Sequence, residues 1–402
     1  MEKQLEWTIH LDKTYYMNVF GDRIPVAFTH GRGSYLYSTE GDKYLDLLGG
    51  IAVNSVGHGN ARLTKAISTQ AKKLIHCSSL YYIPNQGELA RALVEKSFAD
   101  KVFFCNSGAE ANEAAIKLAR AYFAKKGAPR AKFITALKSF HGRTLAAVTA
   151  TGQEKYNKDF APLPGGFSYV PYNDIAALEA VVDDTTCAVM LEIIQGEGGV
   201  IVCDPEYIQA ARRICTEHGA LLIIDEVQTG VGRTGTFFAF EQMNIVPDVV
   251  TLAKGLAGGV PIGAMLTTDE VATTFEPGDH GSTFGGNPLA TAAAMAVLEE
   301  IDKKNLMKNA NVIGDYFKKK LLKIAKNTNA ITAVRGRGLL IGIELTEPSA
   351  VLLKKQLFEK GFLVGSIGDR VIRLAPPLIL TKREASSFLS TLEELLTPKK
   401  VG

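Results

Sequence analysis

Two apolar runs in the middle of the chain each end in a side chain that can take part in chemistry. Residues 221–224 are all leucine or isoleucine and lead into Asp225, and residues 249–252 lead through Ala253 into Lys254. An unbroken apolar run is typical of a strand buried on both faces of a parallel sheet. Because ligands bind at the carboxyl ends of such strands, the pattern predicts that Asp225 and Lys254 share one ligand-binding edge.

An aspartate and a lysine at the same sheet edge suit pyridoxal 5′-phosphate. A lysine amine can bond covalently to the aldehyde of this cofactor, and a carboxylate can keep its pyridine nitrogen protonated so that the ring accepts electrons. Solvated strand ends, or a plain salt bridge, explain the same two residues without any cofactor. The two side chains alone leave both interpretations open.

A turn of small residues at Ser107, Gly108 and Ala109 joins a predicted strand at residues 102–105 to a strong helix-forming segment at residues 108–120. Small residues at a helix start leave backbone N–H groups free and let a phosphate approach closely. A serine in this position is also an ordinary N-cap. The spacing is therefore compatible with a phosphate site and with a simple cap.

Strands and helices alternate through the middle of the chain. We expect strands at residues 102–105, 132–136, 188–192 and 221–225, and a further helix at residues 205–218. Such alternation predicts an α/β domain built on a mostly parallel sheet, and we expect this large domain to occupy residues 50–285.

The two ends of the chain show a different pattern. Long helical patterns run from residue 288 to 326, and short strand patterns follow at residues 338–345 and 371–374, which indicates a smaller α+β domain. Residues 33–46 alternate in polarity around a Glu-Gly-Asp turn and predict a hairpin.

The bulk composition is that of an ordinary globular protein. The 402 residues exceed the usual size of one domain, 46% are hydrophobic and 22% are charged. A net charge of +3 without a long basic run argues against nucleic-acid binding. The chain begins without the apolar core of a signal peptide, and no apolar run approaches membrane-spanning length. Five cysteines without CxxC spacing, three of them in apolar runs, suit the reduced thiols of a cytoplasmic protein.

Residues 225–235, Asp-Glu-Val-Gln-Thr-Gly-Val-Gly-Arg-Thr-Gly, followed by the Lys254 segment, closely resemble the cofactor site of the class III pyridoxal-phosphate aminotransferases of the ornithine and acetylornithine type. The resemblance covers nearly the whole chain. It implies a fold-type-I transferase with pyridoxal 5′-phosphate as cofactor and with Lys254 and Asp225 as the catalytic residues. It also implies that residues 1–49 join residues 286–402 in the smaller domain.

The resemblance assigns the remaining cofactor contacts. Ser107, Gly108 and Ala109 are expected to hold the phosphate, Phe140 to stack on the ring, and Gln228 to reach the ring hydroxyl oxygen; Thr283 is expected to reach the phosphate from the neighbouring subunit. These roles imply a homodimer with shared active sites.

The substrate contacts are assigned in the same way. Arg143 is expected to bind the distal carboxylate of the substrate, with Ser282 beside the substrate, and Arg373 is expected to bind a second carboxylate. An ω-amino substrate has one distal carboxylate, whereas glutamate and 2-oxoglutarate have two carboxylates. We therefore expect a movable pair of Glu197 and Arg373, which neutralises the second arginine while the ω-amino substrate is bound.

The implied reaction moves the ω-amino group of N2-acetyl-L-ornithine to 2-oxoglutarate and yields N-acetyl-L-glutamate 5-semialdehyde and L-glutamate. Ornithine, succinylornithine, 4-aminobutyrate and acetyllysine remain open as amine donors, because the acyl group is selected by pocket shape. An aminomutase of the glutamate-semialdehyde type, which uses the same lysine without net export of the amine, is a rival from another reaction class. A non-catalytic binding protein would lack the lysine.

Two further segments bear on this interpretation. Residues 230–235 match the dinucleotide pattern G-x-G-x-x-G, but residues 225–229 separate them from the strand, and residues 236–240 are expected to be extended rather than helical, so a nicotinamide cofactor is not expected. The seven histidines are scattered and predict no metal site. At residues 59–61, Gly-Asn-Ala stands where relatives usually have a His-Pro pair.

Overall fold

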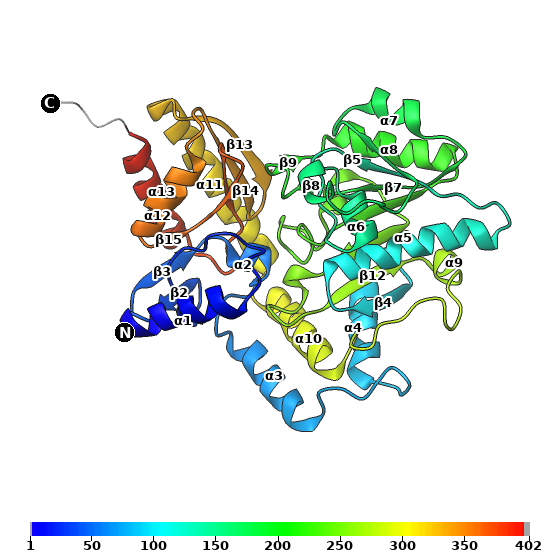
Figure 1. The fold of residues 1–402 in the computed structure, drawn as a ribbon, viewed down its shortest axis with the longest axis horizontal. Helices are drawn as coiled ribbons and strands as arrows, with labels where there is room; N and C mark the ends of the chain where they lie inside the picture. The colour runs from blue at the N-terminus through cyan, green and yellow to red at the C-terminus, as the bar shows by residue number, and fades with distance from the viewer. Residues whose placement is uncertain (1, 398–402) are drawn as a thin grey trace.

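The structure is a computed structural model that describes residues 2–397, and it has two lobes that lie side by side (Figure 1). One lobe contains the middle of the chain, and the other contains both ends. Met1 and residues 398–402, at the extremes of the predicted smaller domain, lie outside the described residues. Within residues 2–397, no helix is both long and apolar enough to cross a membrane.

The larger lobe is built on a seven-stranded sheet with the order β4-β12-β11-β10-β7-β5-β6. The strands are β4 (Lys101–Cys105), β5 (Lys132–Ala136), β6 (Phe167–Val170), β7 (Thr186–Leu191), β10 (Leu221–Asp225), β11 (Val249–Leu252) and β12 (Gly263–Thr267). All neighbours from β11 to β6 are parallel, and β12 is antiparallel to both of its neighbours. The predicted α/β fold with a mostly parallel sheet is confirmed, with β12 as the antiparallel exception.

Strand β10 is buried on both faces, as its unbroken apolar run predicts. Leu221 and Ile223 pack in the cluster under helix α5 (Gly108–Lys125), and Leu222 and Ile224 pack in the cluster on the opposite face. Because side chains alternate along a strand, Asp225 lies on the α5 face. This alternation brings the carboxylate next to the helix that begins at the predicted phosphate turn.

Helices lie around this sheet and in the segment that precedes its first strand, residues 49–94. They are α2 (Gly49–Ala52), α3 (Ala61–Lys73), α4 (Pro84–Val94), α5, α6 (Leu145–Ala150), α7 (Ile175–Val181), α8 (Pro205–Glu217) and α9 (Asp269–Ala272). Short elements are η1 (Glu154–Tyr156), β8 (Ile194–Gln195), β9 (Ile201–Val202), η2 (Ala239–Met243) and η3 (Lys254–Leu256). The expectation of an extended segment at residues 236–240 is wrong: bends lead into the 3-10 helix η2, because Glu241 caps the backbone N–H of Phe238 at 2.8 Å.

The second lobe has two four-stranded sheets, with the orders β13-β14-β17-β16 and β1-β2-β3-β15. Their strands are β1 (Phe28–Arg32), β2 (Tyr35–Ser38), β3 (Lys43–Asp46), β13 (Ile331–Arg337), β14 (Leu340–Leu345), β15 (Phe362–Leu363), β16 (Gly365–Ile367) and β17 (Val371–Leu374). The helices are α11 (Leu306–Thr328), α12 (Ala350–Glu359) and α13 (Lys382–Leu396), whereas α10 (Pro288–Lys303), which precedes them in the chain, packs mainly against α3 and α4 (Figure 1).

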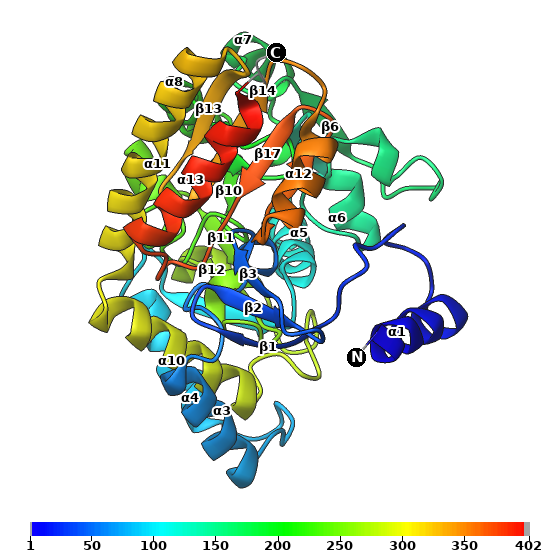
Figure 2. The same cartoon turned by 90° about the vertical axis from the view of Figure 1, so that its left-hand side faces the viewer.

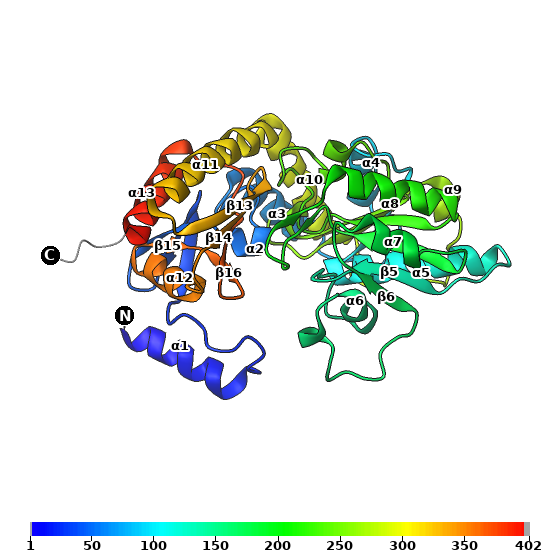
Figure 3. The same ribbon diagram turned by 90° about the horizontal axis from the view of Figure 1, so that it is seen from above.

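The first fifty residues join this lobe through backbone pairing. Strands β2 and β3 form the predicted hairpin, and β15 pairs in parallel with β3, with Phe362 opposite Leu45. Helix α1 (Glu2–Tyr15) is set apart from both lobes (Figures 2 and 3). At the departure from the relatives' pattern, the Asn60 side chain accepts the N–H of Leu63 at 3.0 Å and so caps α3.

Helix α11 approaches the turn between β13 and β14 so closely that only glycine fits at position 314. A Cβ atom there would lie 2.2 Å from the carbonyl oxygen of Gly338. Gly314→Ala should lower the free energy of unfolding, measured by urea denaturation, by about 1–3 kcal/mol, although alanine is the better helix former. Gly87→Ala in α4 is the matched control, since nothing lies within 4 Å of its added Cβ, and it should raise stability by about 0.5–1 kcal/mol. Equal effects of the two substitutions would contradict this packing.

Candidate active site

A cavity of about 400 Å³ lies at the carboxyl ends of β10 and β11, a volume that suits a small cofactor. It is lined by most of the residues that the sequence predicts for the site: Ser107, Gly108, Ala109, Phe140, Arg143, Asp225, Gln228 and Lys254. The remaining predicted residues, Glu197, Ser282, Thr283 and Arg373, do not line it.

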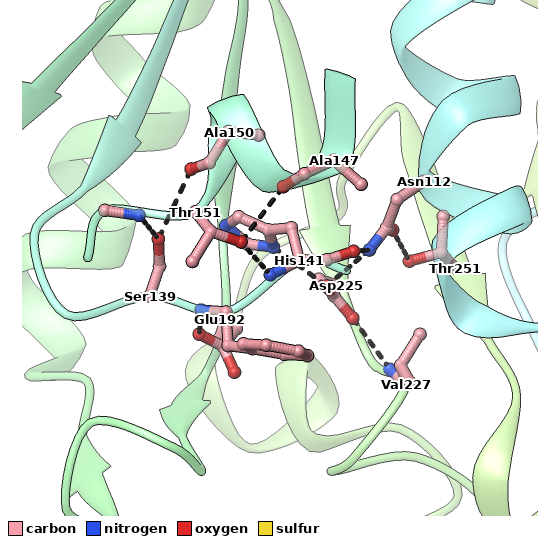
Figure 4. A network of polar contacts seen from close by, with 12 residues as sticks. Asn112, Ser139, His141, Ala147, Ala150, Thr151, Glu192, Asp225, Val227 and Thr251 are labelled. Carbon is pink, nitrogen blue, oxygen red and sulfur yellow. Dashed lines mark hydrogen bonds and ion pairs between the residues drawn. The ribbon is translucent and has the colours of Figure 1, made fainter. Parts of the chain in front are cut away.

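Asp225 is almost fully buried at the end of β10, and three donors hold its carboxylate (Figure 4). Oδ2 accepts from Asn112 Nδ2 and from His141 Nδ1, both at 2.8 Å, and Oδ1 accepts from the backbone N–H of Val227 at 2.9 Å. A carboxylate has about four acceptor positions. One position on Oδ1 is therefore left for a donor that enters the cavity.

Lys254 opens the short helix η3 directly after β11. Burial lowers the pKa of its ammonium to about 8, because desolvation disfavours the charged form; the charge of Glu197 opposes this shift and that of Arg373 adds to it. The backbone of Lys254 has φ +25°, a sparsely populated conformation that persists only where the surroundings enforce it. The site thus presents an amine that is largely neutral at mildly alkaline pH, in a fixed position.

The start of α5 also lines the cavity. Ser107 is the N-cap, and its hydroxyl accepts the N–H of Glu110 at 3.2 Å. Gly108 packs against Val227, where an added Cβ would lie 2.6 Å from Cγ1. The helix therefore begins close to the strand that carries Asp225, and its first N–H groups border the cavity, where the positive end of the helix dipole favours an anion.

Phe140 lines the cavity and packs against a second aromatic ring. The ring of Phe140 meets that of Tyr156 edge to face, with centroids 5.6 Å apart. The guanidinium of Arg143 lies 4.2 Å from the centroid of Tyr156, within cation–π range. Arg143 is exposed, and no carboxylate among the described residues forms an ion pair with it. It is therefore an available cation at the cavity edge.

The second predicted arginine is already paired. Arg373 in β17 is buried and forms an ion pair with Glu197, and its Nη1 also donates to the carbonyl of Gly196 at 3.1 Å. Burial by itself would raise the pKa of Glu197, but the charge and hydrogen bond of Arg373 outweigh it and lower the pKa below its ordinary value. Arg373 Nη1 lies 3.5 Å from Oε1 of the cavity residue Gln228, so the pair is adjacent to the cavity.

Ser282 and Thr283 do not line the cavity that contains Asp225 and Lys254 of their own chain. They border a smaller pocket with Asn106, whose side chain donates to Ser282 Oγ at 3.1 Å. Thr283 is exposed. This chain therefore does not bring Thr283 to its own Asp225 and Lys254.

Three buried polar residues that the sequence analysis did not assign to the site also line the cavity: Asn112, His141 and Glu192. Burial, and then the nearby charge of Asp225, hold the pKa of Glu192 well above its ordinary value. Glu192 could have been recognised from the sequence by its position directly after the apolar strand β7. For Asn112 the signal was a polar residue on the apolar stripe of α5, since the residues three, four and seven positions on are Ala115, Ile116 and Ala119.

The residues present fit pyridoxal 5′-phosphate. Lys254 could bond to the aldehyde, the open position on Asp225 could accept from the pyridine nitrogen, and the start of α5 could hold the phosphate. The cavity volume accommodates a group of this size. These features occur together in one cavity, whereas a strand-end salt bridge explains only the first two residues.

Comparison with known proteins agrees with this geometry. Residues 16–396 match the profile of the family described as aminotransferase class-III. An acetylornithine aminotransferase of Caldanaerobacter subterraneus subsp. tengcongensis is 51% identical over 97% of this chain and 99% of its own length. One from Methanocaldococcus jannaschii is 48% identical over 99% of both chains. The crystal structure of the ornithine aminotransferase from Toxoplasma gondii superposes with a TM-score of 0.93 at 33% identity, over 97% of this chain and 94% of that one.

The lowered pKa of Lys254 can be measured in cofactor-free protein with a small amine-modifying reagent. Only the neutral amine reacts, so the modification rate of Lys254, followed by peptide mass spectrometry, should rise with pH around a midpoint of about 8. Glu197→Gln removes a charge that stabilises the ammonium and should move the midpoint down, whereas Arg373→Met should move it up. A midpoint at the ordinary value of 10.5 would contradict the burial argument.

Proposed function

The chain belongs to the class III aminotransferase family, and from this premise we propose that it transfers the ω-amino group of N2-acetyl-L-ornithine to 2-oxoglutarate. The products are N-acetyl-L-glutamate 5-semialdehyde and L-glutamate. The observation that carries the proposal is the charge arrangement of the site: Arg143 is available at the cavity edge, and Arg373 is neutralised by Glu197. This arrangement suits an amine donor with one carboxylate, and the relatives at about half identity are named for that donor.

Class III aminotransferases depend on pyridoxal phosphate, which supplies an electron sink for the substrate carbon when bound. Ser107, Gly108 and Ala109 would hold its phosphate, Phe140 would cover the ring, and Gln228 would reach the ring hydroxyl. Asp225 Oδ1 would keep the proton on the pyridine nitrogen, because its last acceptor position is open there. These assignments follow the family pattern and are consistent with the cavity lining.

Four side chains of this chain then have distinct roles in the two half-reactions. Neutral Lys254 Nζ would accept the proton from the substrate carbon and serve as the proton carrier of the transfer, a role that its lowered pKa favours near pH 8. Arg143 holds the distal carboxylate of either substrate. For glutamate, Glu197 must leave Arg373 so that the guanidinium can bind the α-carboxylate, whereas for acetylornithine the pair stays closed.

We also propose a homodimer with shared active sites and a cytoplasmic location. Thr283 is exposed and outside its own cavity, and large apolar side chains near α3 and α4 are uncovered, with Leu80 84% and Tyr82 105% exposed. An uncovered apolar surface of this kind is typical of an interface. All five cysteines are free thiols, as expected in a reducing compartment.

A substrate panel tests the donor. We expect kcat/KM for acetylornithine to exceed the values for succinylornithine, ornithine, 4-aminobutyrate and acetyllysine, with turnover that requires added 2-oxoglutarate. Ornithine is the second candidate, because a solved ornithine aminotransferase superposes over nearly the whole chain. A higher kcat/KM for ornithine would replace the proposed donor, and turnover without 2-oxoglutarate would favour an aminomutase.

The division of carboxylates between the arginines should separate the half-reactions. Arg373→Ala should slow the glutamate half-reaction by about 10- to 100-fold, the cost of a lost charged contact, and leave the acetylornithine one nearly unchanged. Arg143→Ala should slow both. Glu197→Ala should shift selectivity toward glutamate, because Arg373 is then unmasked. Single-turnover absorption spectra of the cofactor measure each half-reaction, and an equal slowing of both by Arg373→Ala would make Arg373 a structural residue.

Complementation tests the shared site. Lys254→Ala should be inactive, and Thr283→Ala should bind the cofactor weakly. If Thr283 serves the neighbouring subunit, a hybrid dimer of the two variants contains one intact site. Equal amounts refolded together should then recover about one quarter of wild-type activity, since roughly half of the dimers are hybrids with one good site each. A mixture no more active than the mean of its parents would refute the shared site.

A further inference from the structure

Asn112 occupies an unusual place, because its amide contacts three other segments that line the cavity or lead into it (Figure 4). Its Nδ2 donates to Asp225 Oδ2 at 2.8 Å and to the carbonyl of His141 at 2.6 Å. Its Oδ1 accepts the hydroxyl of Thr251 at 2.7 Å. The residue itself sits in α5, one turn after Gly108. One side chain thus links the strand of Asp225, the strand that leads to Lys254, the Phe140–His141 loop and the phosphate helix.

The sheet register explains why these groups meet. Asp225 in β10 pairs with Thr251 in β11, and both side chains lie on the α5 face because side chains alternate along each strand. Asn112 faces this pair from the buried stripe of α5, and all three side chains are almost completely inaccessible to solvent. A buried polar group must be hydrogen-bonded or it costs stability, and here the polar groups satisfy each other.

The orientation of the amide has only one solution. With the opposite orientation, Oδ1 would face two acceptors, the Asp225 carboxylate and the carbonyl of His141. The hydroxyl of Thr251 makes the observed orientation self-consistent, since it donates to Oδ1 and has no carboxylate partner. Thr251 therefore fixes Asn112, and Asn112 together with His141 fixes which lone pairs of Asp225 are occupied.

We propose that Asn112, oriented by Thr251, is a positioning residue that holds Asp225 so that its last open acceptor position faces the cofactor's pyridine nitrogen. The proposal rests on the proposed role of Asp225 and adds a physical reason for the direction in which its carboxylate faces. Without Asn112, the carboxylate keeps His141 and Val227 as donors but gains a second open position on Oδ2, away from Oδ1. The carboxylate can then turn, and the pyridine proton is held less firmly.

Matched variants of Thr251 give the cleanest test, because they alter one hydroxyl. Thr251→Val removes the donor at nearly constant volume, and Thr251→Ser keeps it. We expect Thr251→Val and Asn112→Ala to lower kcat by about 10- to 100-fold, the range found when hydrogen bonds that orient metal-binding side chains are removed, with KM for the amine donor nearly unchanged. Thr251→Ser should keep kcat close to the wild-type value, because the serine hydroxyl can donate to Asn112 Oδ1 in the same way.

Two measurements separate positioning from simple destabilisation and from failure of the proposed function. The pH titration of the bound cofactor's visible absorption should shift in Thr251→Val and Asn112→Ala but stay as in wild type in Thr251→Ser. Thermal unfolding identifies variants that merely lose stability. If the folded, cofactor-loaded Thr251→Val and Asn112→Ala proteins keep wild-type kcat and titration, the positioning role is refuted while the proposed function stands. A wild-type protein that takes up no pyridoxal phosphate would refute the proposed function itself.

Discussion

The buried carboxylate of Asp225 is the constraint around which this site is organised. A charge removed from water is tolerated only when donors surround it, and here the donors come from α5, from the loop after β5 and from the turn that follows β10. Those same segments carry residues 107–109 and Phe140, which we propose hold the phosphate and cover the ring. The hydrogen bonds to this one carboxylate therefore hold together three segments that line the cavity.

The second organising feature is the contrast between the two arginines. Arg143 is exposed at the cavity edge and rests on an aromatic ring, whereas Arg373 is buried and paired with Glu197. Breaking a buried pair leaves an uncompensated charge, so Arg373 becomes available only when another carboxylate replaces Glu197. Under the proposed function, this contrast lets one site use substrates with one or two carboxylates.

Much of this architecture could be predicted from sequence, and the exceptions have physical reasons. The strand at residues 221–225 was recognisable because burial on both faces leaves residues 221–224 entirely apolar. Strand β12 was not anticipated, because its direction depends on pairing with distant β4 and β11. The expectation of an extended segment at residues 236–240 was wrong, because the hydrogen bond from the Phe238 N–H to Glu241 starts a helical turn and overrides the β-propensity of the aromatic residues. Asn112 was overlooked because the role of a single asparagine in a helix depends on partners that are distant in sequence. The domain boundaries near residues 50 and 285 and the roles of the individual site residues stay predictions.

The protonation of the pyridine nitrogen tests the central claim most directly. If the open position on Asp225 receives that nitrogen, the enzyme loaded with pyridoxal phosphate labelled with ¹⁵N in the ring should show the chemical shift of a protonated pyridine throughout the pH range of activity. In Asp225→Ala the same nucleus should show the unprotonated shift. An unprotonated nitrogen in the wild-type enzyme would contradict the account, because the carboxylate would then have no proton to hold.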